Sequence, residues 1–450
     1  MMTKAKTTIS RLWLTEIQLE EGDSPSMIDS VDQLKLVLTR LIAKLDSLIS
    51  EQLSEVIQYP CFKQLEASWL EVSSLVSLPV SQRRVRIKIL DATWQEVSED
   101  LNTFFNLKCS ALFKKLYSDE FDMAGGTPFG LLVLGHKITS SYEESQHFED
   151  LYTLQLLSEL CEMAFCPAIL GIDEYFFGDN PKYILNDSLR VKRILQSDDF
   201  SSWQLLRDRI TSRFIHLVLP EYLLRKPYVH YAAGFMFSES QLDAKSLWGN
   251  SVFLLASNIV REFDRVSWFS FLSSYDDSKN SGAIVSQSEE VITKVDIHSE
   301  EDGFWSEEGF IALSSIYLSG QKGFFSNCSV WKAPDDTAHL QGMLQTNLMG
   351  CRFGHYIKVQ LRELVGLYDS AAACQHRLSE WLQYYTNSGQ FADDSIMARY
   401  PLKSFEVHIK ESPNDKTRYM CKFILQPQNQ FGMMDAKLIL ETSVLGYKSD

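Results

Sequence analysis

The sequence predicts an α/β (mixed α+β) protein of more than one domain, with mixed sheets that are flanked by helices. At 450 residues, the chain is long enough to form two or three hydrophobic cores. Hydrophobic residues make up 45% and charged residues 23%, which is an ordinary balance for globular proteins. Apolar residues recur every second position in some segments and every third or fourth in others. Strands and helices should therefore alternate along the chain.

Residues 1–58 are predicted to form a strand arm, a linker and an amphipathic helix. An alternating stretch at Ile9–Ile17 is typical of a strand, and no hairpin partner follows it. The turn-rich spacer Glu21–Ser26 comes next. Leucines then recur at steps of four and three, which indicates a helix that Pro60 ends. These leucines are Leu34, Leu38, Leu41, Leu45 and Leu48.

Residues 59–331 are predicted to form a central α/β region, because strand and helix patterns alternate there. Ser270–Glu301 is rich in Ser, Asp and Gly and should be an exposed loop or small excursion. The expected helices are Phe62–Val76, Trp94–Tyr117, Glu144–Phe165 and Trp203–Ser212. The expected strands are Val85–Ile89, Gly130–Leu134, Ala168–Ile172, Phe214–Leu219, Phe310–Leu318 and Gly323–Val330.

Residues 332–450 are predicted to form a C-terminal domain of helices followed by a β-sheet. The turn Lys332–Asp336 marks the expected boundary, and Ser412–Asp415 supplies a hairpin turn. The expected helices are Leu344–Tyr368 and Cys374–Tyr385. The expected strands are Ser404–Lys410, Thr417–Gln426 and Ala436–Thr442.

Charge and composition argue against several classes of protein. Lys and Arg total 43 against 59 Asp and Glu, so the net charge is −16 and phosphate backbones would repel the chain. No apolar stretch approaches the roughly 18 residues that a membrane span needs, and no secretory signal is visible. Cys161 and Cys166 lack the spacing of a zinc or redox site, which favours reduced, buried thiols. We expect a cytoplasmic protein that binds neither nucleic acid nor membrane.

The sequence carries little that predicts catalysis, a cofactor or a metal. The glycine cluster Gly125–Gly130 precedes a strand and lacks the lysine of a phosphate-binding loop, so a tight turn is expected. His216 lies in an apolar strand, and His355 lies on a helix. The adjacent carboxylates Asp173 and Glu174 follow a strand end, where α/β enzymes do place acids. An α/β enzyme that uses this pair stays an alternative, against a purely structural role.

Six segments in the same order resemble the TssC (VipB, EvpB) family, the large contractile-sheath subunits of bacterial type VI secretion systems. The similarity runs from about residue 30 to residue 443. Tyr59–Trp69, for example, is similar to the family pattern HPDFQALEAxWRGL. The other segments are Leu116–Gly130, Arg213–Tyr228, Leu247–Asn250, Arg352–Lys358 and Ala398–Leu402.

The resemblance implies a non-enzymatic scaffold with a multi-domain sheath fold. Such chains pair with a small subunit, TssB, and polymerise into a helical tube around an inner tube of Hcp. Contraction drives the inner tube outward, the ATPase ClpV recycles the sheath through the small subunit, and the tube joins a baseplate. Terminal strands of such subunits complete sheets on their neighbours, and strand edges with unpaired main-chain groups suit that role.

The resemblance also suggests residues for these contacts. The candidate inner-tube contacts are three cations on one predicted helix, Arg352, Lys358 and Arg362, which could equally be a solvated face. The candidate inter-subunit strand contacts are Ile9, Leu12, Trp13, Leu14, Phe405, Val407, Ile409, Phe423, Leu425, Leu438 and Leu440.

The chain also departs from the family pattern. Its N-terminal region is short, Arg225-Lys226-Pro227 replaces a more common Arg-Leu-Pro, and Ser270–Asp302 lacks the usual glycine-rich texture. The sequence therefore leaves two interpretations open. The chain is either the main sheath subunit or a non-polymerising paralogue that acts as an adaptor or cap.

Overall fold

A computed structural model describes residues 31–123, 125–140, 148–232, 234–239, 246–276, 281–286, 290–317, 319–364, 371–387, 399–411, 418–428 and 437–445. The predicted strand Ile9–Ile17 and spacer Glu21–Ser26 lie outside these residues. The chain divides into two compact units. The smaller consists of residues 1–63 and 226–246, and the larger of residues 64–225 and 247–450.

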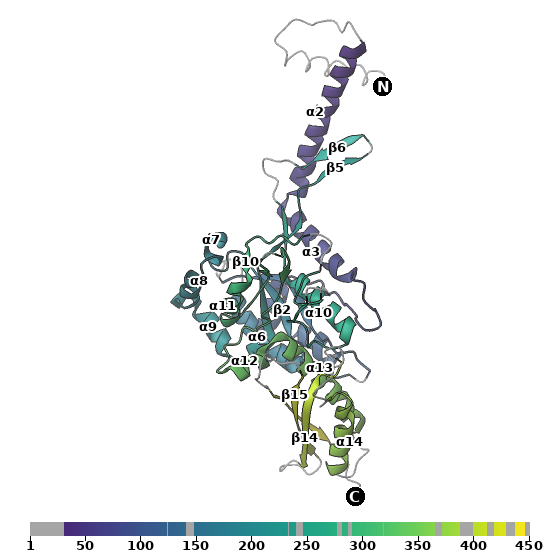
Figure 1. Cartoon of the computed structure of the whole chain (residues 1–450), viewed down its shortest axis with the longest axis vertical. Helices are drawn as coiled ribbons and strands as arrows, with labels where there is room; N and C mark the ends of the chain where they lie inside the picture. Colours follow the sequence, from purple (N-terminus) through teal and green to yellow (C-terminus); the bar gives the residue numbers. More distant parts are fainter. Residues whose placement is uncertain are drawn as a thin grey trace. The chain divides into compact units, whose positions relative to one another are not determined.

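Helices and strands alternate along the described chain, as the sequence predicts (Figure 1). The helices are α2 (Val31–Ile57), α3 (Pro60–Val76), α4 (Trp94–Thr103), α5 (Ala111–Phe113), α6 (Asp150–Ala164), α7 (Pro181–Leu185), α8 (Ser188–Leu195), α9 (Ser201–Asp208), α10 (Val252–Val266), α11 (Asp302–Glu307), α12 (Asp336–Gly342), α13 (Leu344–Leu364) and α14 (Ala371–Gln383). The strands are β1 (Leu132–Ile138), β2 (Ala168–Ile172), β3 (Ile215–Leu219), β4 (Tyr222–Arg225), β5 (Val229–Ala232), β6 (Phe235–Ser238), β7 (Leu247–Gly249), β8 (Tyr275–Asp276), β9 (Ser281–Gly282), β10 (Ile297–His298), β11 (Phe310–Ala312), β12 (Ser314–Ser315), β13 (Lys322–Gly323), β14 (Leu402–Glu411), β15 (Arg418–Pro427) and β16 (Leu438–Leu445).

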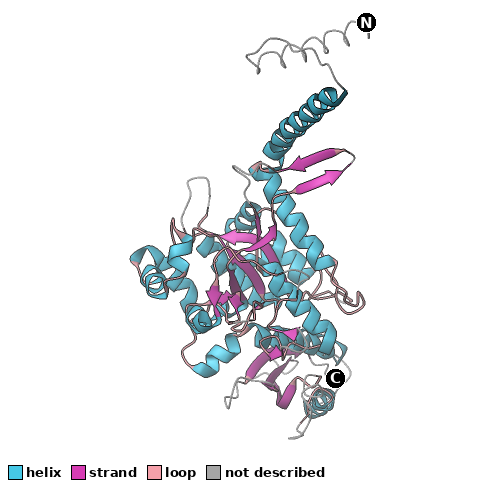
Figure 2. Ribbon diagram, turned by 45° about the horizontal axis from the view of Figure 1, so that its top comes forward, coloured by secondary structure: helices cyan, strands magenta, loops and turns pink. Residues whose placement is uncertain are grey.

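The smaller unit is built from the long helix α2 and an antiparallel hairpin, β5–β6. Both ribbon views show the hairpin beside the helix (Figures 1 and 2). The helix matches the leucine pattern at steps of four and three. Its polar side chains Asp46 and Ser50 hydrogen-bond to the hairpin, as shown below.

The larger unit is centred on a parallel sheet with the strand order β1-β2-β3-β11. Successive residues of each strand enter different cores. Leu170 and Leu217 pack into the first core, whereas Ile169 and Val218 pack into the second. Helices α6 and α9 supply the first core and α10 the second. The sheet is therefore covered by helices on both faces, as the pattern of strands separated by helices predicts.

The C-terminal part forms a separate antiparallel sheet with the order β14-β15-β16. Its alternate residues Val407 and Phe423 are buried in a third core, together with Phe353 of α13 and Leu378 of α14. Helix α13 also places Leu344 in the second core, so one helix connects the parallel and antiparallel sheets. The three predicted strands are confirmed, with bounds that differ from the predicted ones by one to three residues.

Val85–Ile89 was expected to be a strand, and this prediction is wrong. The Arg84 guanidinium donates to the Asp264 carbonyl oxygen at 2.7 Å, and Lys88 pairs with Glu120. The segment forms no strand and pairs with no described strand. Its apolar residues are not buried by a sheet either, since Ile87 is 38% and Ile89 66% exposed.

The single helix predicted at Trp94–Tyr117 is divided into α4, α5 and short helical turns. Thr93 forms a capping box at the start of α4, and the side chains of Asn106 and Ser110 accept main-chain hydrogen bonds at two later starts. Each cap begins a new turn. The helical spacing therefore continues in the sequence although the helix axis does not.

Two further expectations are corrected. The described residues of Ser270–Glu301 include buried Leu272, Ile284 and Ile297, so this region is not simply an exposed loop. Of the strand predicted at Gly323–Val330, only Gly323 is paired, in β13. Isolated apolar residues, each buried separately, carry no periodic signal that a sequence pattern could detect.

Replacing Gly171 tests how tightly the parallel sheet is covered. A Cβ atom added at Gly171 would lie 2.4 Å from the Asn250 side-chain oxygen, and both residues are buried. We expect Gly171→Ala to cost roughly 1–3 kcal/mol of unfolding free energy and to lower the midpoint of thermal unfolding in calorimetry. Gly130→Ala is the control, because nothing lies within 4 Å of its added Cβ. Equal midpoints for the two variants would contradict this packing.

Candidate assembly surfaces

Helix α2 exposes most of its apolar side chains. Large residues on the helix remain 38% to 57% exposed, and they recur at the spacing of a helical stripe. A soluble helix ordinarily buries such a stripe against its own core. The apolar stripe of α2 is defined by Leu38, Ile42, Leu45, Leu48, Ile49, Leu53 and Val56.

The polar side of α2 holds the hairpin. The Met236 N–H donates to the Asp46 carboxylate at 3.2 Å, and the Ser238 N–H donates to the Ser50 hydroxyl at 3.4 Å. Ser50 and Ser54 are buried. Ser50 lies two residues beyond Leu48, which is about 200° around the helix. The hairpin thus lies opposite Leu48 but borders the stripe at Leu53, which follows Ser50 by three residues. The stripe residues nevertheless remain 38% to 57% exposed among the described residues.

The C-terminal sheet has two outer strands, β14 and β16. Among the described residues, β14 is bridged on its outer side at Leu402, to Thr386, and no strand pairs with the outer side of β16. Outer strands present unpaired main-chain groups that can accept a strand from another chain. A strand from a neighbouring subunit could therefore be added to this sheet.

The structure brings together all seven C-terminal residues that the sequence suggests as strand contacts, in one core. Val407, Ile409, Phe423 and Leu425 are buried, whereas Phe405, Leu438 and Leu440 are partly buried against them. These side chains face the interior of this chain. A subunit contact along the sheet would therefore use the main chain of its outer strands. The N-terminal candidates Ile9, Leu12, Trp13 and Leu14 lie outside the described residues.

The three cations suggested as inner-tube contacts have partners within the larger unit. The Arg352 guanidinium lies 4.6 Å from the Trp268 ring centre and donates to the Ser267 carbonyl at 2.7 Å. Lys358 binds Asp122 at 2.8 Å, and Arg362 donates to the carbonyl of Phe121. These contacts fasten α13 to two other segments. A role in gripping an inner tube stays a prediction.

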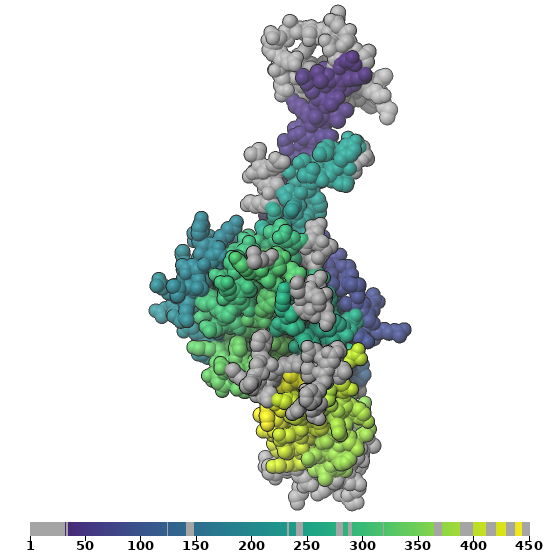
Figure 3. Space-filling view, in the orientation of Figure 1, coloured from purple at the N-terminus to yellow at the C-terminus, as the bar shows by residue number. Residues whose placement is uncertain are grey.

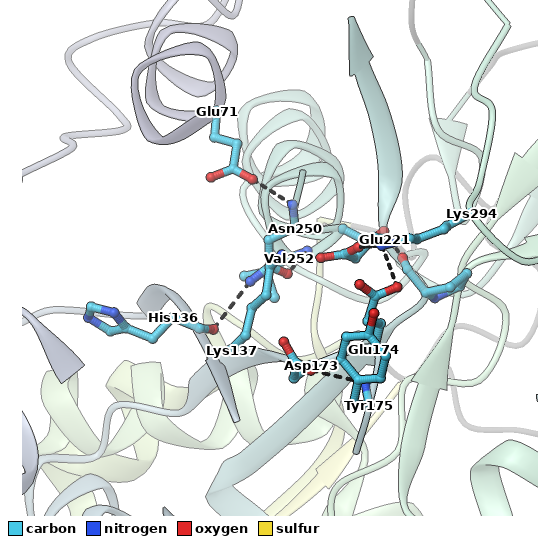
Figure 4. A network of polar contacts seen from close by, with 12 residues as sticks. Glu71, His136, Lys137, Asp173, Glu174, Tyr175, Glu221, Asn250, Val252 and Lys294 are labelled. Carbon is cyan, nitrogen blue, oxygen red and sulfur yellow. Dashed lines mark hydrogen bonds and ion pairs between the residues drawn. The ribbon is translucent and has the colours of Figure 1, made fainter. Parts of the chain in front are cut away.

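Charged side chains converge at the carboxyl end of the parallel sheet (Figure 4). Lys294 binds Glu174 at 2.5 Å and Glu221 at 2.8 Å, and Lys137 also binds Glu221. Burial would raise the pKa of Glu221, but the two lysines outweigh it and hold the pKa below its usual value. For Asp173, burial outweighs a hydrogen bond from the Tyr175 N–H and raises the pKa.

Beside this cluster, Glu71 of α3 receives a hydrogen bond from the Asn250 N–H at 2.5 Å (Figure 4). Glu71 is 4% exposed, and burial raises its pKa to about 7. The Asn250 amide group donates to the His136 carbonyl and accepts from the Val252 N–H at the start of α10. Glu71 and Asn250 thereby connect α3, β1 and α10.

A cavity of about 240 Å³ adjoins the charged cluster, and Asp173, Glu174 and Lys294 line it together with apolar side chains. The structure therefore places the two predicted carboxylates together at a cavity. Glu174 is held by Lys294 and Asp173 by a main-chain donor. These contacts favour a structural role for the pair.

The described part of the chain has neither a metal-binding cluster nor a membrane-spanning helix. Within the described ranges, no group of three or more His, Cys, Asp or Glu side chains is placed to hold a metal ion. None of the helices described is long and apolar enough to cross a membrane.

Comparison with protein families decides the assignment. Residues 39–331 match the EvpB/VC_A0108 tail sheath N-terminal domain, and residues 333–444 match the EvpB/VC_A0108 tail sheath gpW/gp25-like domain. The chain belongs to this family of type VI secretion sheath large subunits. Membership implies a structural, non-enzymatic role, partnership with a small sheath subunit and polymerisation.

A curated relative supports the assignment. The type VI secretion system sheath protein TssC1 of Pseudomonas aeruginosa PAO1 is 25% identical over 461 residues, which covers 97% of this chain and 89% of the relative. Two solved sheath tail proteins are far more distant and add no argument. The Desulfitobacterium hafniense protein shares 7% identity (70% of this chain, 56% of that chain, TM-score 0.35), and the Listeria innocua protein 8% (66%, 61%, TM-score 0.33).

Sequence reasoning missed the hairpin β5–β6 and the residues that hold it. Its signal was two short aromatic-rich runs separated by a turn that contains Gly234, whose φ is +86°. Asp46 and Ser50 gave no signal, because scattered polar residues on a helix normally face solvent. That the apolar stripe of α2 is exposed was equally invisible, since a buried stripe has the same spacing.

Replacing Glu71 tests the polar connection between α3 and the sheet. Because its pKa is about 7 in the folded chain and 4.5 ordinarily, its stabilising contribution is present below pH 4.5 and is lost as pH rises to about 7. Gln cannot ionise, so Glu71→Gln should gain stability over the wild type across this range, by up to ~3 kcal/mol. Chemical unfolding at pH 5, 6, 7 and 8 measures the difference. A difference between Glu71→Gln and the wild type that does not change with pH would contradict the raised pKa of Glu71.

Proposed function

We propose that this chain is the main large subunit of a contractile type VI sheath in the bacterial cytoplasm. It pairs with a small TssB-like subunit, and the pairs polymerise into a helical tube around an inner Hcp tube. Contraction of the tube propels the inner tube, and the ATPase ClpV recycles the sheath through the small subunit. Family membership supports the role of sheath subunit, and the exposed surfaces support the assembly steps.

The exposed apolar stripe of α2 is the observation that carries this proposal. A fully buried Leu or Ile side chain contributes roughly 1.5–3 kcal/mol relative to an exposed one. The stripe runs along much of a 27-residue helix, about 40 Å at 1.5 Å per residue. So long an uncovered apolar surface needs a partner. We assign the small subunit to it.

Polymerisation is proposed to use the C-terminal sheet. The outer strands β14 and β16 would accept strands from neighbouring subunits, among them the N-terminal arm at Ile9–Ile17 of another copy. Main-chain hydrogen bonds persist when subunits rotate, provided that the linking segments are pliable. The spacer Glu21–Ser26 is suited to that role.

Two alternatives remain distinguishable by experiment. A paralogue that caps or anchors a sheath would pair with the small subunit without forming tubes. An enzyme using Asp173 and Glu174 would need its cavity, rather than α2, for activity. Negative-stain microscopy of the co-expressed pair separates the first alternative from the main proposal, and formation of regular tubes decides for the sheath.

Charged substitutions in the apolar stripe test the pairing. We expect Leu38→Glu, Leu45→Glu and Leu48→Glu each to weaken binding of the small subunit at least tenfold, because each places a charge in a desolvated contact. Co-purification and calorimetric titration measure the effect. Thr39→Glu adds the same charge at another exposed position of the helix and should bind like the wild type. Unchanged binding in all three stripe variants would refute this pairing surface.

The spacer gives a second test, at the level of the assembled tube. Inserting a few Gly and Ser residues within Glu21–Ser26 should leave tubes assembled but weaken contraction, because a slack link transmits less movement between subunits. Microscopy of extended and contracted tubes measures both effects. Full contraction with the longer spacer would remove the arm from the mechanism.

A further inference from the structure

The hairpin of the smaller unit has two edges, and the main-chain bonds identify which groups point outward from each. Glu239 N–H donates to the Tyr228 carbonyl, so Tyr228 and Glu239 form a hydrogen-bonded pair. Antiparallel pairs alternate between bonded and non-bonded. His230 and Phe237 therefore bond each other. Val229 and Tyr231, which oppose Ser238 and Met236, direct their N–H and C=O groups away from the hairpin.

The edge of β6 is closed by α2. Its outward groups are the main-chain groups of Met236 and Ser238, and they meet Asp46 and Ser50 of the helix. These contacts independently confirm the alternation. The helix thus satisfies the outward main-chain groups of one of the two hairpin edges. It does so with polar side chains that are not part of its leucine pattern.

The edge of β5 is open. No described residue bonds the outward N–H and C=O groups of Val229 and Tyr231. Their side chains share one face of the hairpin with Met236, and all three are exposed, at 65%, 66% and 46%. The opposite face includes the buried Phe237. An isolated two-stranded hairpin is marginally stable in water, and a third strand would both pair this edge and widen its apolar face.

An open groove of about 370 Å³ lies between this face and α2, as the purple helix and the teal hairpin in Figure 3 help to locate. Met236 and Ser238 line one side, and Ser47 and Glu51 line the other. Glu51 follows Leu48 by three residues and is therefore its neighbour on the helix surface. The groove consequently borders the apolar stripe.

We propose that β5 accepts an extended strand from the same small subunit that covers the apolar stripe of α2. This inference rests on the proposed function. The strand would bond the outward groups of Val229 and Tyr231 and place apolar side chains beside theirs, on the face that they share with Met236. The continuity of stripe and groove argues for one partner, because a chain lying on Leu48 meets the groove at Glu51. The neutral face of Val229, Tyr231 and Met236 favours an uncharged segment.

Hydrogen exchange tests the proposal directly on the wild-type chain. The amides of Val229 and Tyr231 should exchange rapidly in the chain alone and become protected in the complex with the small subunit, because each then donates to the added strand. The amide of Phe237, which bonds within the hairpin, should already be protected before the partner is added. Unprotected Val229 and Tyr231 amides in a formed complex would overturn the inference.

A proline variant tests the same edge by affinity. Tyr231→Pro removes an outward N–H while sparing the bonds within the hairpin, and proline is tolerated where the N–H faces solvent. We expect it to bind the small subunit roughly tenfold more weakly. Tyr231→Thr lacks the ring but keeps the donor, so the difference between the two variants isolates the main-chain bond. Phe237 amide protection verifies that the hairpin is intact in each.

The outcomes separate this inference from the function on which it rests. If the stripe variants abolish pairing while Tyr231→Pro binds like Tyr231→Thr, the strand inference fails and the pairing proposal stands. If wild-type chains do not pair at all, both fail. If the Val229 and Tyr231 amides are already protected in the chain alone, something other than the small subunit occupies this edge. The occupant is a second copy if the protection rises with protein concentration. It is another segment of the same chain if the protection does not change. Either result overturns the small subunit as the occupant.

Discussion

Burial of the parallel sheet on both faces is the constraint on which the larger unit depends. Each strand contributes alternate residues to two cores, so helices must cover both sides. The close approach of Asn250 to Gly171 leaves no room for a side chain on β2 there. At the carboxyl end of the strands, Lys294 and Lys137 compensate the charge of Glu221, whose pKa burial alone would raise. The charged cluster is thereby explained by the requirements of folding.

Helix α13 connects that sheet to the C-terminal domain. Its first turns pack in the second core and later turns in the third, beneath the antiparallel sheet. Arg352, Lys358 and Arg362 bind segments that belong to the body of the larger unit. Cations that resembled a binding face in the sequence thus hold this helix in place. The antiparallel sheet is supported from one face, and among the described residues no strand pairs with the outer side of β16.

The sequence predicted regular, repetitive features well. Strand β2 matches its predicted range, because an aliphatic run buried on both faces has a strong signature, and α2 follows its leucines. Prediction failed where the role of a residue depended on partners that are far away in the sequence. Glu174 was found at a strand end, but Lys294 lies 120 residues further along the chain, and nothing local connects them. Likewise, no pattern indicates that Ser50 of α2 meets a hairpin about 190 residues away.

An amphipathic helix ordinarily packs against its own chain with its apolar side, whereas α2 contacts its hairpin with polar side chains. This difference suggests how the assembly contacts are divided. Ser50 and Asp46 use hydrogen bonds to hold the hairpin, and the leucine side of α2 stays exposed among the described residues. Apolar contact supplies affinity but little directional information, because the hydrophobic effect is non-directional. A strand edge has the opposite properties. Its hydrogen bonds specify the register of the added strand, while each contributes only a modest free energy of binding. A partner that engages both surfaces is held firmly by the helix and aligned by the strand.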